Sequence, residues 1–339
     1  MSFKKIIKRG IQHLAARFGR HTRSHKEPQL VVLMYHRILP KQDPRTQQEE
    51  PGMMVTPETF KMHMSLVKQH FEILPLSQWI KRKQNRETLP ERCCAITFDD
   101  GWEDNYEFAY PILQELQLPA TIFLVSDMIG TDQLFWPERL AHLLTDIALT
   151  CPERWGHPDL AWLTNNKFSY TFTTTPPDQE QLSEIINSAK ALRDEEIHQR
   201  INKIEAELQL KNTSQPSLLS WQQMSEMCAS GLIEAGGHTC HHIRLNAGQS
   251  EATLEQEIVQ CKSQIEAQLG QTVDTFCYPN GDYSPRAVEL VKQHYQCAVT
   301  TNRDWNTASS DQYLLNRIGV HEDISYDKTA FLARLSGWL

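Results

Sequence analysis

The sequence predicts an α/β protein, a distorted (β/α) barrel of parallel strands that carries a helical insertion. Short apolar runs alternate with amphipathic segments along most of the chain, as they do where strands and helices alternate. The alternation stops between about residues 131 and 217 and then resumes. Polar motifs follow directly after several apolar runs, and strand ends are where such barrels build active sites. The length of 339 residues suits one large domain with an insertion, or two domains.

The expected elements follow one another in a regular order. Strands are expected at residues 30–35, 71–74, 95–98, 120–125, 232–237, 275–278 and 298–300. Thr56 and Pro57 are typical of a helix start, with Thr as the cap and Pro in the first turn. Further helices are expected at residues 110–116, 221–230, 253–269 and 328–339. Because helices separate consecutive strands, the strands are expected to run parallel.

The chain divides into an N-terminal segment, residues 1–27, and a barrel domain, residues 28–339. The insertion, at about 131–217, lies within the barrel domain and offers no catalytic constellation of its own. We expect the insertion to pack near the barrel mouth and to shape access of the substrate.

The N-terminal segment is basic and amphipathic. Its first 26 residues contain eight Lys and Arg residues and no acid. On a helical wheel its apolar side chains cluster on one side, away from most of the basic ones; the cluster consists of Phe3, Ile7, Ile11, Leu14 and Phe18. This pattern is typical of a helix at an anionic membrane surface. A helix packed on its own domain, or a partly disordered tail, is the alternative.

Composition narrows the class of protein. The formal net charge is −8 although the N-terminal segment is basic, so the remaining chain is strongly acidic, which argues against nucleic acid as a partner. No apolar run approaches the roughly 18 residues of a membrane-spanning helix, and no secretory signal is recognisable. The eight cysteines show neither a zinc pattern nor a disulfide framework. We therefore expect a cytoplasmic protein, peripheral on the inner face of the membrane if the N-terminal helix binds lipid.

An acidic pair and a histidine pair carry the chemistry. Asp99 and Asp100 end the strand expected at 95–98, and at a strand end both carboxylates can reach one cleft. His238 and His242 are four residues apart, so in a helical turn they would share a face. One carboxylate and two imidazoles make a three-ligand divalent metal site with open positions for water and substrate. The carboxylate left over is then placed to act as a base.

These motifs resemble the polysaccharide deacetylases, the NodB-homology group of metal-dependent carbohydrate de-N-acetylases. Residues 97–101 match the first motif of that family and residues 238–242 match its second. Residues 276–281 resemble the third motif, and Asp304 with Trp305 the fourth. Residues 34–38, Met-Tyr-His-Arg-Ile, resemble an N-terminal motif of the permuted branch, where an early His replaces the C-terminal one. The resemblance runs from about residue 30 to the C-terminus, apart from the insertion.

The resemblance implies a role for each motif residue. Asp100, His238 and His242 would hold a divalent metal, with Zn²⁺ as the expected ion, and Asp99 would be the general base. His36 would be the acid; His321 is the rival, near the place where the unpermuted family has its acid.

The third motif implies an oxyanion donor and lacks a basic residue. The main-chain N–H of Asn280 is the expected oxyanion donor. The Arg that usually begins this motif is missing, since Phe276 and Cys277 stand there, so Arg317 or Arg303 is expected to neutralise Asp99 instead.

Five residues are expected at the substrate cleft: Tyr35, Trp102, Tyr278, Trp305 and Arg317. The Tyr residues and Trp102 can stack on sugar faces, and Trp305 can wall the acetyl pocket. Each of these aromatic residues is equally compatible with core packing.

The resemblance implies a metal-dependent hydrolase that removes N-acetyl groups from an amino sugar in a polysaccharide or lipid-linked glycan. Hydrolysis of a secondary amide needs an activated water, a stabiliser for the oxyanion and a proton donor for the amine, and the residues above can supply them. Two alternatives remain open: a non-catalytic carbohydrate-binding protein on the same fold, and an amidohydrolase of a non-sugar amide.

Overall fold

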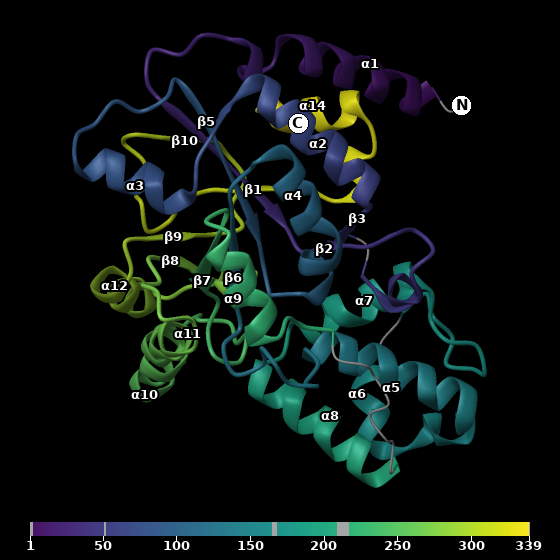
Figure 1. Cartoon of the computed structure of the whole chain (residues 1–339). Coiled ribbons are helices and arrows are strands. Elements are labelled where there is room, and N and C mark those ends of the chain that lie inside the picture. Colours follow the sequence, from purple (N-terminus) through teal and green to yellow (C-terminus); the bar gives the residue numbers. More distant parts are fainter. Residues whose placement is uncertain (1–2, 51, 165–167, 209–216, 339) are drawn as a thin grey trace. The chain divides into compact units, whose positions relative to one another are not determined.

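A computed structural model describes the whole chain except residues 1–2, 51, 165–167, 209–216 and 339 (Figure 1). It consists of two compact units. The first, which we call the barrel unit, comprises Met1–Pro40, Met54–Thr131 and Ser217–Leu339; the second, the insert unit, comprises Lys41–Met53 and Asp132–Pro216.

The barrel unit is built on a curled parallel sheet, as the sequence predicts (Figure 1). The central strands lie in the order β1-β5-β6-β7-β8-β9, and every neighbouring pair in this series is parallel. Their bounds are β1 (Gln29–Tyr35), β5 (Arg92–Phe98), β6 (Ala120–Leu124), β7 (Ile233–Gly237), β8 (Thr275–Cys277) and β9 (Cys297–Val299). The first three are almost entirely buried, as expected for parallel strands covered on both faces.

Short strands extend this sheet at its margins. β4 (Glu72–Ile73) pairs with β5 and β11 (Ile318–Gly319) with β1, both in parallel, whereas β10 (Asn306–Thr307) pairs antiparallel with β1. β2 (Arg37–Ile38) and β3 (Met54–Val55) form a separate parallel pair.

The register of the sheet brings distant motifs together. Tyr35 pairs with Phe98 across β1 and β5, and Leu124 pairs with Gly237 across β6 and β7. Gly237 in turn pairs with Phe276 of β8. The residues that follow β1, β5 and β7 therefore leave the sheet at one edge, the carboxyl ends of its parallel strands.

Helices follow the strands, largely where the sequence predicts them. Their bounds are α2 (Pro57–His70), α3 (Leu76–Gln84), α4 (Tyr110–Leu116), α9 (Trp221–Ala229), α10 (Glu251–Leu254), α11 (Cys261–Leu269), α12 (Pro285–His294), α13 (Glu322–Ser325) and α14 (Lys328–Leu335). Thr56 caps α2 by accepting a hydrogen bond from the N–H of Thr59. The segment 251–269 differs from expectation: a π-helical segment, η6 (Glu255–Gln260), joins α10 to α11.

The N-terminal helix α1 (Phe3–Phe18) packs against α14 within the barrel unit (Figure 1). Among the residues that the structure describes, no helix is long and apolar enough to cross a membrane.

The insert unit is helical and has its own core. Its helices are α5 (Trp136–Thr150), α6 (Ala161–Thr164), α7 (Gln179–Ala189) and α8 (Asp194–Leu208). Leu140 and Leu144 of α5 pack in one buried cluster with Ile185 of α7 and with Ile197 and Ile201 of α8. The amphipathic spacing of these residues therefore buries one face of each long helix.

Candidate active site

The two pairs predicted from the sequence meet at the carboxyl edge of the sheet. The Oδ1 atom of Asp100 lies 3.4 Å from Nε2 of His238 and 3.4 Å from Nε2 of His242. The three ligand atoms lie within 4.8 Å of one another. His238 is buried, and the His242 side chain remains 21% exposed, so the cluster is open to solvent on one side.

Neighbouring groups orient this cluster for a cation. Nδ1 of His238 lies 2.8 Å from the carbonyl oxygen of Cys277; because a carbonyl can only accept, Nδ1 carries a proton, and Nε2 is the nitrogen that faces Asp100. The indole N–H of Trp102 donates to Oδ2 of Asp100 at 2.9 Å, which leaves Oδ1 to face the histidines. One carboxylate oxygen and two imidazole nitrogens thus converge, and this donor set fits a divalent metal ion.

The charges of the cluster are strongly coupled. Burial opposes the ionised form of Asp100, but the hydrogen bond from His238 and the charges of His242 and His36 outweigh it and hold the pKa of Asp100 well below its usual value. Burial opposes the charged form of His238, whereas Cys277 and Asp100 favour it and the pKa of His238 is raised. A bound cation would displace the proton from Nε2 of His238, so metal binding is expected to release protons.

Four residues at or near the site have backbone angles in the left-handed region of φ and ψ. Asp100 (φ 76°), Thr239 (φ 67°), His242 (φ 58°) and Asn280 (φ 55°) all have positive φ, which costs non-glycine residues energy. His238 and His242 consequently lie on a loop after β7 and not on a helical turn, so that part of the prediction is wrong. Their Nε2 atoms nevertheless both approach Oδ1 of Asp100.

Asp99 forms a buried ion pair with Arg317. The guanidinium of Arg317 donates to both carboxylate oxygens, at 2.6 and 2.7 Å, and Cys277 Sγ lies 3.1 Å from the same guanidinium. Burial raises the pKa of Asp99, but the charge and hydrogen bonds of Arg317 outweigh burial and leave the pKa below its usual value. Of the two candidate partners, Arg317 is the one; Arg303 instead donates to the carbonyl of Arg334.

His36 lies beside the acidic pair. Its Nε2 is 3.8 Å from Oδ2 of Asp99, and its side chain is 20% exposed. Asn105 fixes the loop after β1, because its side-chain amide donates a hydrogen bond to the His36 carbonyl at 2.8 Å. Arg37 and Asp104 form a buried ion pair at 2.9 Å, and the Arg37 guanidinium lies 4.1 Å from the centre of the Trp102 ring.

Comparison with known proteins identifies the family. A family model described as polysaccharide deacetylase matches residues 86–296. The chain belongs to the polysaccharide deacetylase family. The Bacillus subtilis protein YxkH, assigned to the same family, is 26% identical over 306 residues, which cover 89% of this chain and 75% of that protein. A poly-β-1,6-N-acetyl-D-glucosamine N-deacetylase of Staphylococcus epidermidis is 30% identical over 132 residues, 36% of this chain and 45% of the relative.

Solved structures of other proteins share the fold. The Streptococcus pyogenes deacetylase PplD, determined in complex with acetate, superposes with a TM-score of 0.59 at 18% identity, covering 93% of this chain and 100% of that one. IcaB from Ammonifex degensii superposes with a TM-score of 0.58 at 18% identity, covering 90% and 97%. The predicted NodB-type barrel is therefore confirmed.

Most of the predicted substrate-binding residues are core residues. Tyr35 is fully buried, with its hydroxyl 3.1 Å from Nδ1 of His63, and Tyr278 is fully buried against Phe276. Trp102 is 2% exposed and binds Asp100. Stacking of these rings on a sugar is therefore wrong, because sugar stacking needs an accessible ring face.

Two further expectations for the cleft are also wrong. Trp305 precedes β10, which pairs with the first residues of β1, so it lies at the opposite end of that strand from His36. Its indole donates to the carbonyl of Leu335 at 3.1 Å, and it does not wall an acetyl pocket. Arg317 is fully buried and serves Asp99, so it is not a substrate contact.

The rival acid, His321, and the expected oxyanion donor, Asn280, follow two other strands of the parallel sheet. His321 precedes α13, its Nδ1 lies 3.5 Å from Asp323, and burial lowers its pKa. Asn280 follows β8 in a tight turn, and its carbonyl accepts from Thr301 at 3.0 Å. The role of the Asn280 N–H stays a prediction.

Sequence reasoning missed Glu257, which supports the histidine loop. One of its oxygens accepts the N–H groups of Cys240 and His241, at 2.9 and 3.0 Å, and the other lies 2.7 Å from Nδ1 of His241. A signal existed: Glu257 lies three residues after Leu254 and four before Cys261, so it is an acid in the buried stripe of a helical segment.

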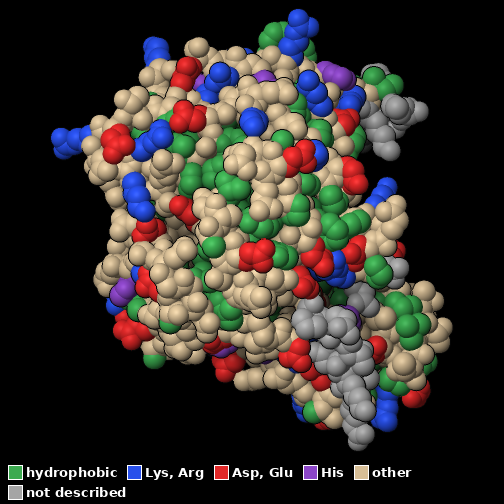
Figure 2. All heavy atoms as spheres, in the orientation of Figure 1, with side chains coloured by type: hydrophobic (Ala, Val, Ile, Leu, Met, Phe, Trp, Pro, Cys, Tyr) green, Lys and Arg blue, Asp and Glu red, His purple; other side chains and the backbone are tan. Residues whose placement is uncertain are grey.

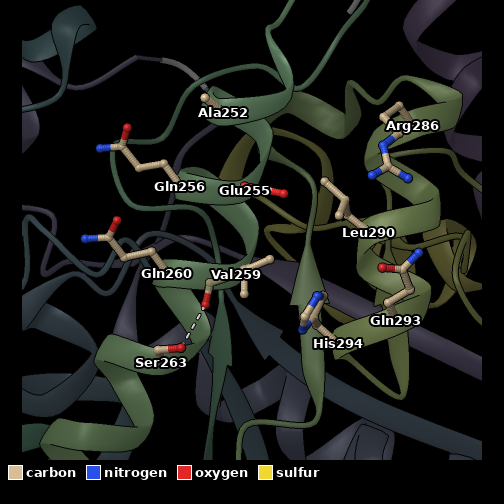
Figure 3. A pocket seen from close by; sticks show the side chains of 10 residues that line it. All are labelled: Ala252, Glu255, Gln256, Val259, Gln260, Ser263, Arg286, Leu290, Gln293 and His294. Carbon is tan, nitrogen blue, oxygen red and sulfur yellow. Dashed lines mark hydrogen bonds between the residues drawn. The ribbon is translucent and has the colours of Figure 1, made fainter.

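A separate groove lies between η6 with α11 on one side and α12 on the other (Figure 3). Its lining includes Glu255, Gln260, Arg286 and His294, and none of the residues of the candidate active site.

Proposed function

We propose that this chain hydrolyses an N-acetyl group on an amino sugar, with Asp100, His238 and His242 as metal ligands. The observation that carries the proposal is their convergence on one point, with the ionised carboxylate of Asp99 and the imidazole of His36 alongside. The family membership supports the reaction class.

The residues divide the work of amide hydrolysis. A bound divalent cation supplies Lewis acidity, which activates water and polarises the acetamide carbonyl. Asp99 takes a proton from the attacking water as the water oxygen bonds to the carbonyl carbon. His36 gives a proton to the departing nitrogen as the C–N bond breaks, so that acetate and a free amine leave. Arg317 keeps Asp99 ionised, and the N–H of Asn280 is the proposed oxyanion donor.

Zinc is the ion that we propose for the cluster. A mixed nitrogen and oxygen donor set of three residues, with positions left for water and substrate, is typical of catalytic zinc. Elemental analysis of the purified protein tests this assignment, and iron, cobalt or manganese at comparable stoichiometry would contradict it.

The substrate that we propose is an N-acetylated glycan, either lipid-linked or still growing, reached by peripheral contact of residues 1–26 with the inner, cytoplasmic face of an anionic membrane. The staphylococcal relative, which acts on poly-β-1,6-N-acetyl-D-glucosamine by its name, supports the glycan. The eight cysteines are all free thiols, which supports a reducing compartment. The basic amphipathic helix α1 supports the membrane.

A substrate panel tests the proposal. Acetate release is measured with β-1,6-linked N-acetylglucosamine oligosaccharides, lipid-linked N-acetyl sugars, and a non-sugar acetamide. We expect release from the sugars and little from the acetamide. Preferential cleavage of the acetamide would favour the general amidohydrolase. Absence of release from every compound, in protein shown to contain metal, would favour a non-catalytic binding protein.

A further inference from the structure

The helix α1 exposes its apolar side chains, unlike an ordinary surface helix, which buries them. Its large apolar side chains are about half exposed: Ile6 (55%), Ile7 (48%), Ile11 (45%), Leu14 (55%) and Phe18 (46%). Among the described residues, only four other large hydrophobic side chains are at least 36% exposed. Two of these, Tyr326 and Trp338, lie in the C-terminal segment, near Arg9 and Arg23 respectively. A surface helix of a globular domain normally buries its apolar stripe.

The face of α1 that adjoins this apolar stripe packs against the rest of the barrel unit. Ala15 is fully buried, and a Cβ at Gly19 would lie 2.5 Å from Cβ of Ser336, so that only glycine allows this close approach. The N–H of Arg20 donates to the Ser336 carbonyl at 2.9 Å. Arg9 pairs with Asp327, with a shortest distance of 2.6 Å. Small and polar residues therefore dock the helix, and the apolar stripe faces away from the domain.

Basic side chains border the exposed stripe on both sides. At 100° per residue, Lys8 and Arg17 fall on opposite sides of the part of the stripe formed by Ile7, Ile11, Leu14 and Phe18, and both are exposed. Beyond the helix, the Arg23 guanidinium lies 5.6 Å from the centre of the exposed Trp338 ring. Figure 2 shows Lys and Arg side chains beside hydrophobic ones along the upper edge of the molecule, where α1 lies in Figure 1.

We propose that the outer face of α1, together with Trp338, is a preformed docking surface for an anionic lipid bilayer. This inference specifies the surface behind the membrane contact proposed above, and it does not depend on the catalytic assignment. The apolar stripe would enter the boundary between headgroups and acyl chains, and Trp338 would sit at the headgroup level. Lys8, Arg17 and Arg23 would face lipid phosphates and attract the helix to an anionic surface.

Charge favours a lipid surface over a second copy of this chain. If two α1 faces packed together about a twofold axis, the basic borders of each would approach those of the other, and like charges across an interface are unfavourable. Anionic headgroups are instead complementary to the same borders.

Vesicle binding by the full chain tests the inference. Wild-type protein is sedimented with phosphatidylcholine vesicles that contain or lack phosphatidylglycerol, and is compared with Ile11→Glu/Leu14→Glu. Substitution is sharper than removal of residues 1–26, which would uncover the α14 surface at Ser336. The matched control is Leu149→Glu, at an even more exposed apolar residue (63%) in α5.

We expect wild type and Leu149→Glu to bind anionic vesicles, and the double variant to bind roughly tenfold more weakly or not at all. Lys8→Glu/Arg17→Glu should weaken binding and reduce its dependence on salt. Equal binding by wild type and the Ile11→Glu/Leu14→Glu variant would overturn the inference. A concentration-dependent dimer in solution that this variant abolishes would also overturn it, by assigning the face to a second copy. Acetate release from a soluble oligosaccharide should be unchanged in every variant.

Discussion

Asp99 depends on a cation supplied from a distant part of the chain. The Arg expected at the start of the third motif is replaced by Cys277, and Arg317, 218 residues after Asp99, occupies the position beside the carboxylate. The sequence shows that an Arg is missing, but it could not decide between Arg317 and Arg303. That choice depends on the pairing of β11 with β1, a long-range contact with no local signature.

Removing Arg317 should move the acidic limb of the pH profile upward. Arg317 lowers the pKa of Asp99, so the wild-type base stays ionised as the pH falls. In Arg317→Met, burial acts without that compensation, the pKa of Asp99 rises, and kcat/KM should decline at a higher pH than in wild type. Because an unpaired buried carboxylate costs about 3–5 kcal/mol, circular dichroism must first show that the variant folds.

Arg317→Lys is the conservative companion, since it restores the charge but not the paired hydrogen bonds. Its acidic limb should lie between those of wild type and Arg317→Met. Identical limbs in all three proteins would show that Arg317 is structural and does not set the ionisation of Asp99.

The choice of acid can be tested at two histidines. His36 lies 3.8 Å from Asp99, whereas His321 pairs with Asp323 and has a lowered pKa. His36→Ala should lower kcat by about 10²–10⁴ while the metal content stays the same, and His321→Ala should have a much smaller effect. The reverse ranking would transfer the acid role to His321.

Aromatic residues show the limit of reading single residues. Tyr35, Trp102 and Tyr278 occur in the right motifs, but their rings are buried, and a sequence does not reveal which way a ring at a strand end points. Trp102 nevertheless serves the site, because its N–H orients Asp100.

At the scale of elements, the loop at 238–242 is the part that sequence periodicity described wrongly. A spacing of four residues suggests a helical turn, but Thr239 and His242 adopt positive φ and the segment is a loop. The loop is fixed from outside: Asp127 donates its N–H to the Cys240 carbonyl at 3.1 Å, and Glu257 accepts two N–H groups from the other side.

Glu257 should therefore control metal affinity. In Glu257→Ala the loop loses the acceptor for two backbone N–H groups, and we expect the affinity for Zn²⁺ to fall about 10- to 100-fold, measured by calorimetric titration. Glu257→Gln keeps an acceptor oxygen and should retain most of the affinity.

The matched control is Glu234→Ala. Glu234 is a half-buried acid in β7, the strand that leads to His238, and it accepts from Ser77 at 2.7 Å, away from the loop. Its removal should lower stability but leave Zn²⁺ affinity near the wild-type value. An equal loss of affinity in both Ala variants would mean that general destabilisation, and not support of the loop, explains the effect.

At the scale of the whole molecule, hydrophobic patterning predicts the barrel well. Apolar runs bounded by Gly, Pro and caps locate the strands to within a few residues, because parallel strands are buried on both faces. The π-helical segment η6 and the close approach of the chain at Gly19 to Ser336 were not predicted. Both depend on tertiary contacts, at Glu257 and at Ser336 respectively, that no local pattern records.

The fold should lose stability between pH 6.5 and pH 4. His63 is fully buried between Tyr35 and the Ser325 carbonyl, and burial lowers its pKa to about 4. The folded state keeps His63 neutral, so the contribution of His63 to the free energy of unfolding is complete above pH 6.5. It is lost as the pH falls, because the unfolded chain then binds a proton that the folded chain does not bind.

The expected loss from His63 is about 3 kcal/mol in the free energy of unfolding across this range, measured by urea denaturation. His63→Gln, which cannot titrate, should be less stable at pH 7 but should show a shallower decline. An identical slope in both proteins would contradict the assignment to His63.

We propose above that Asp100, His238 and His242 hold the metal while Asp99 acts as the general base. This proposal is tested most directly by measuring bound metal and acetate release on the same preparations of wild type, His238→Ala and Asp99→Asn. We predict that His238→Ala loses both metal and activity, whereas Asp99→Asn keeps the metal and loses about 10²–10⁴-fold in turnover. Unchanged metal content in His238→Ala, or near-normal turnover in Asp99→Asn, would contradict the account.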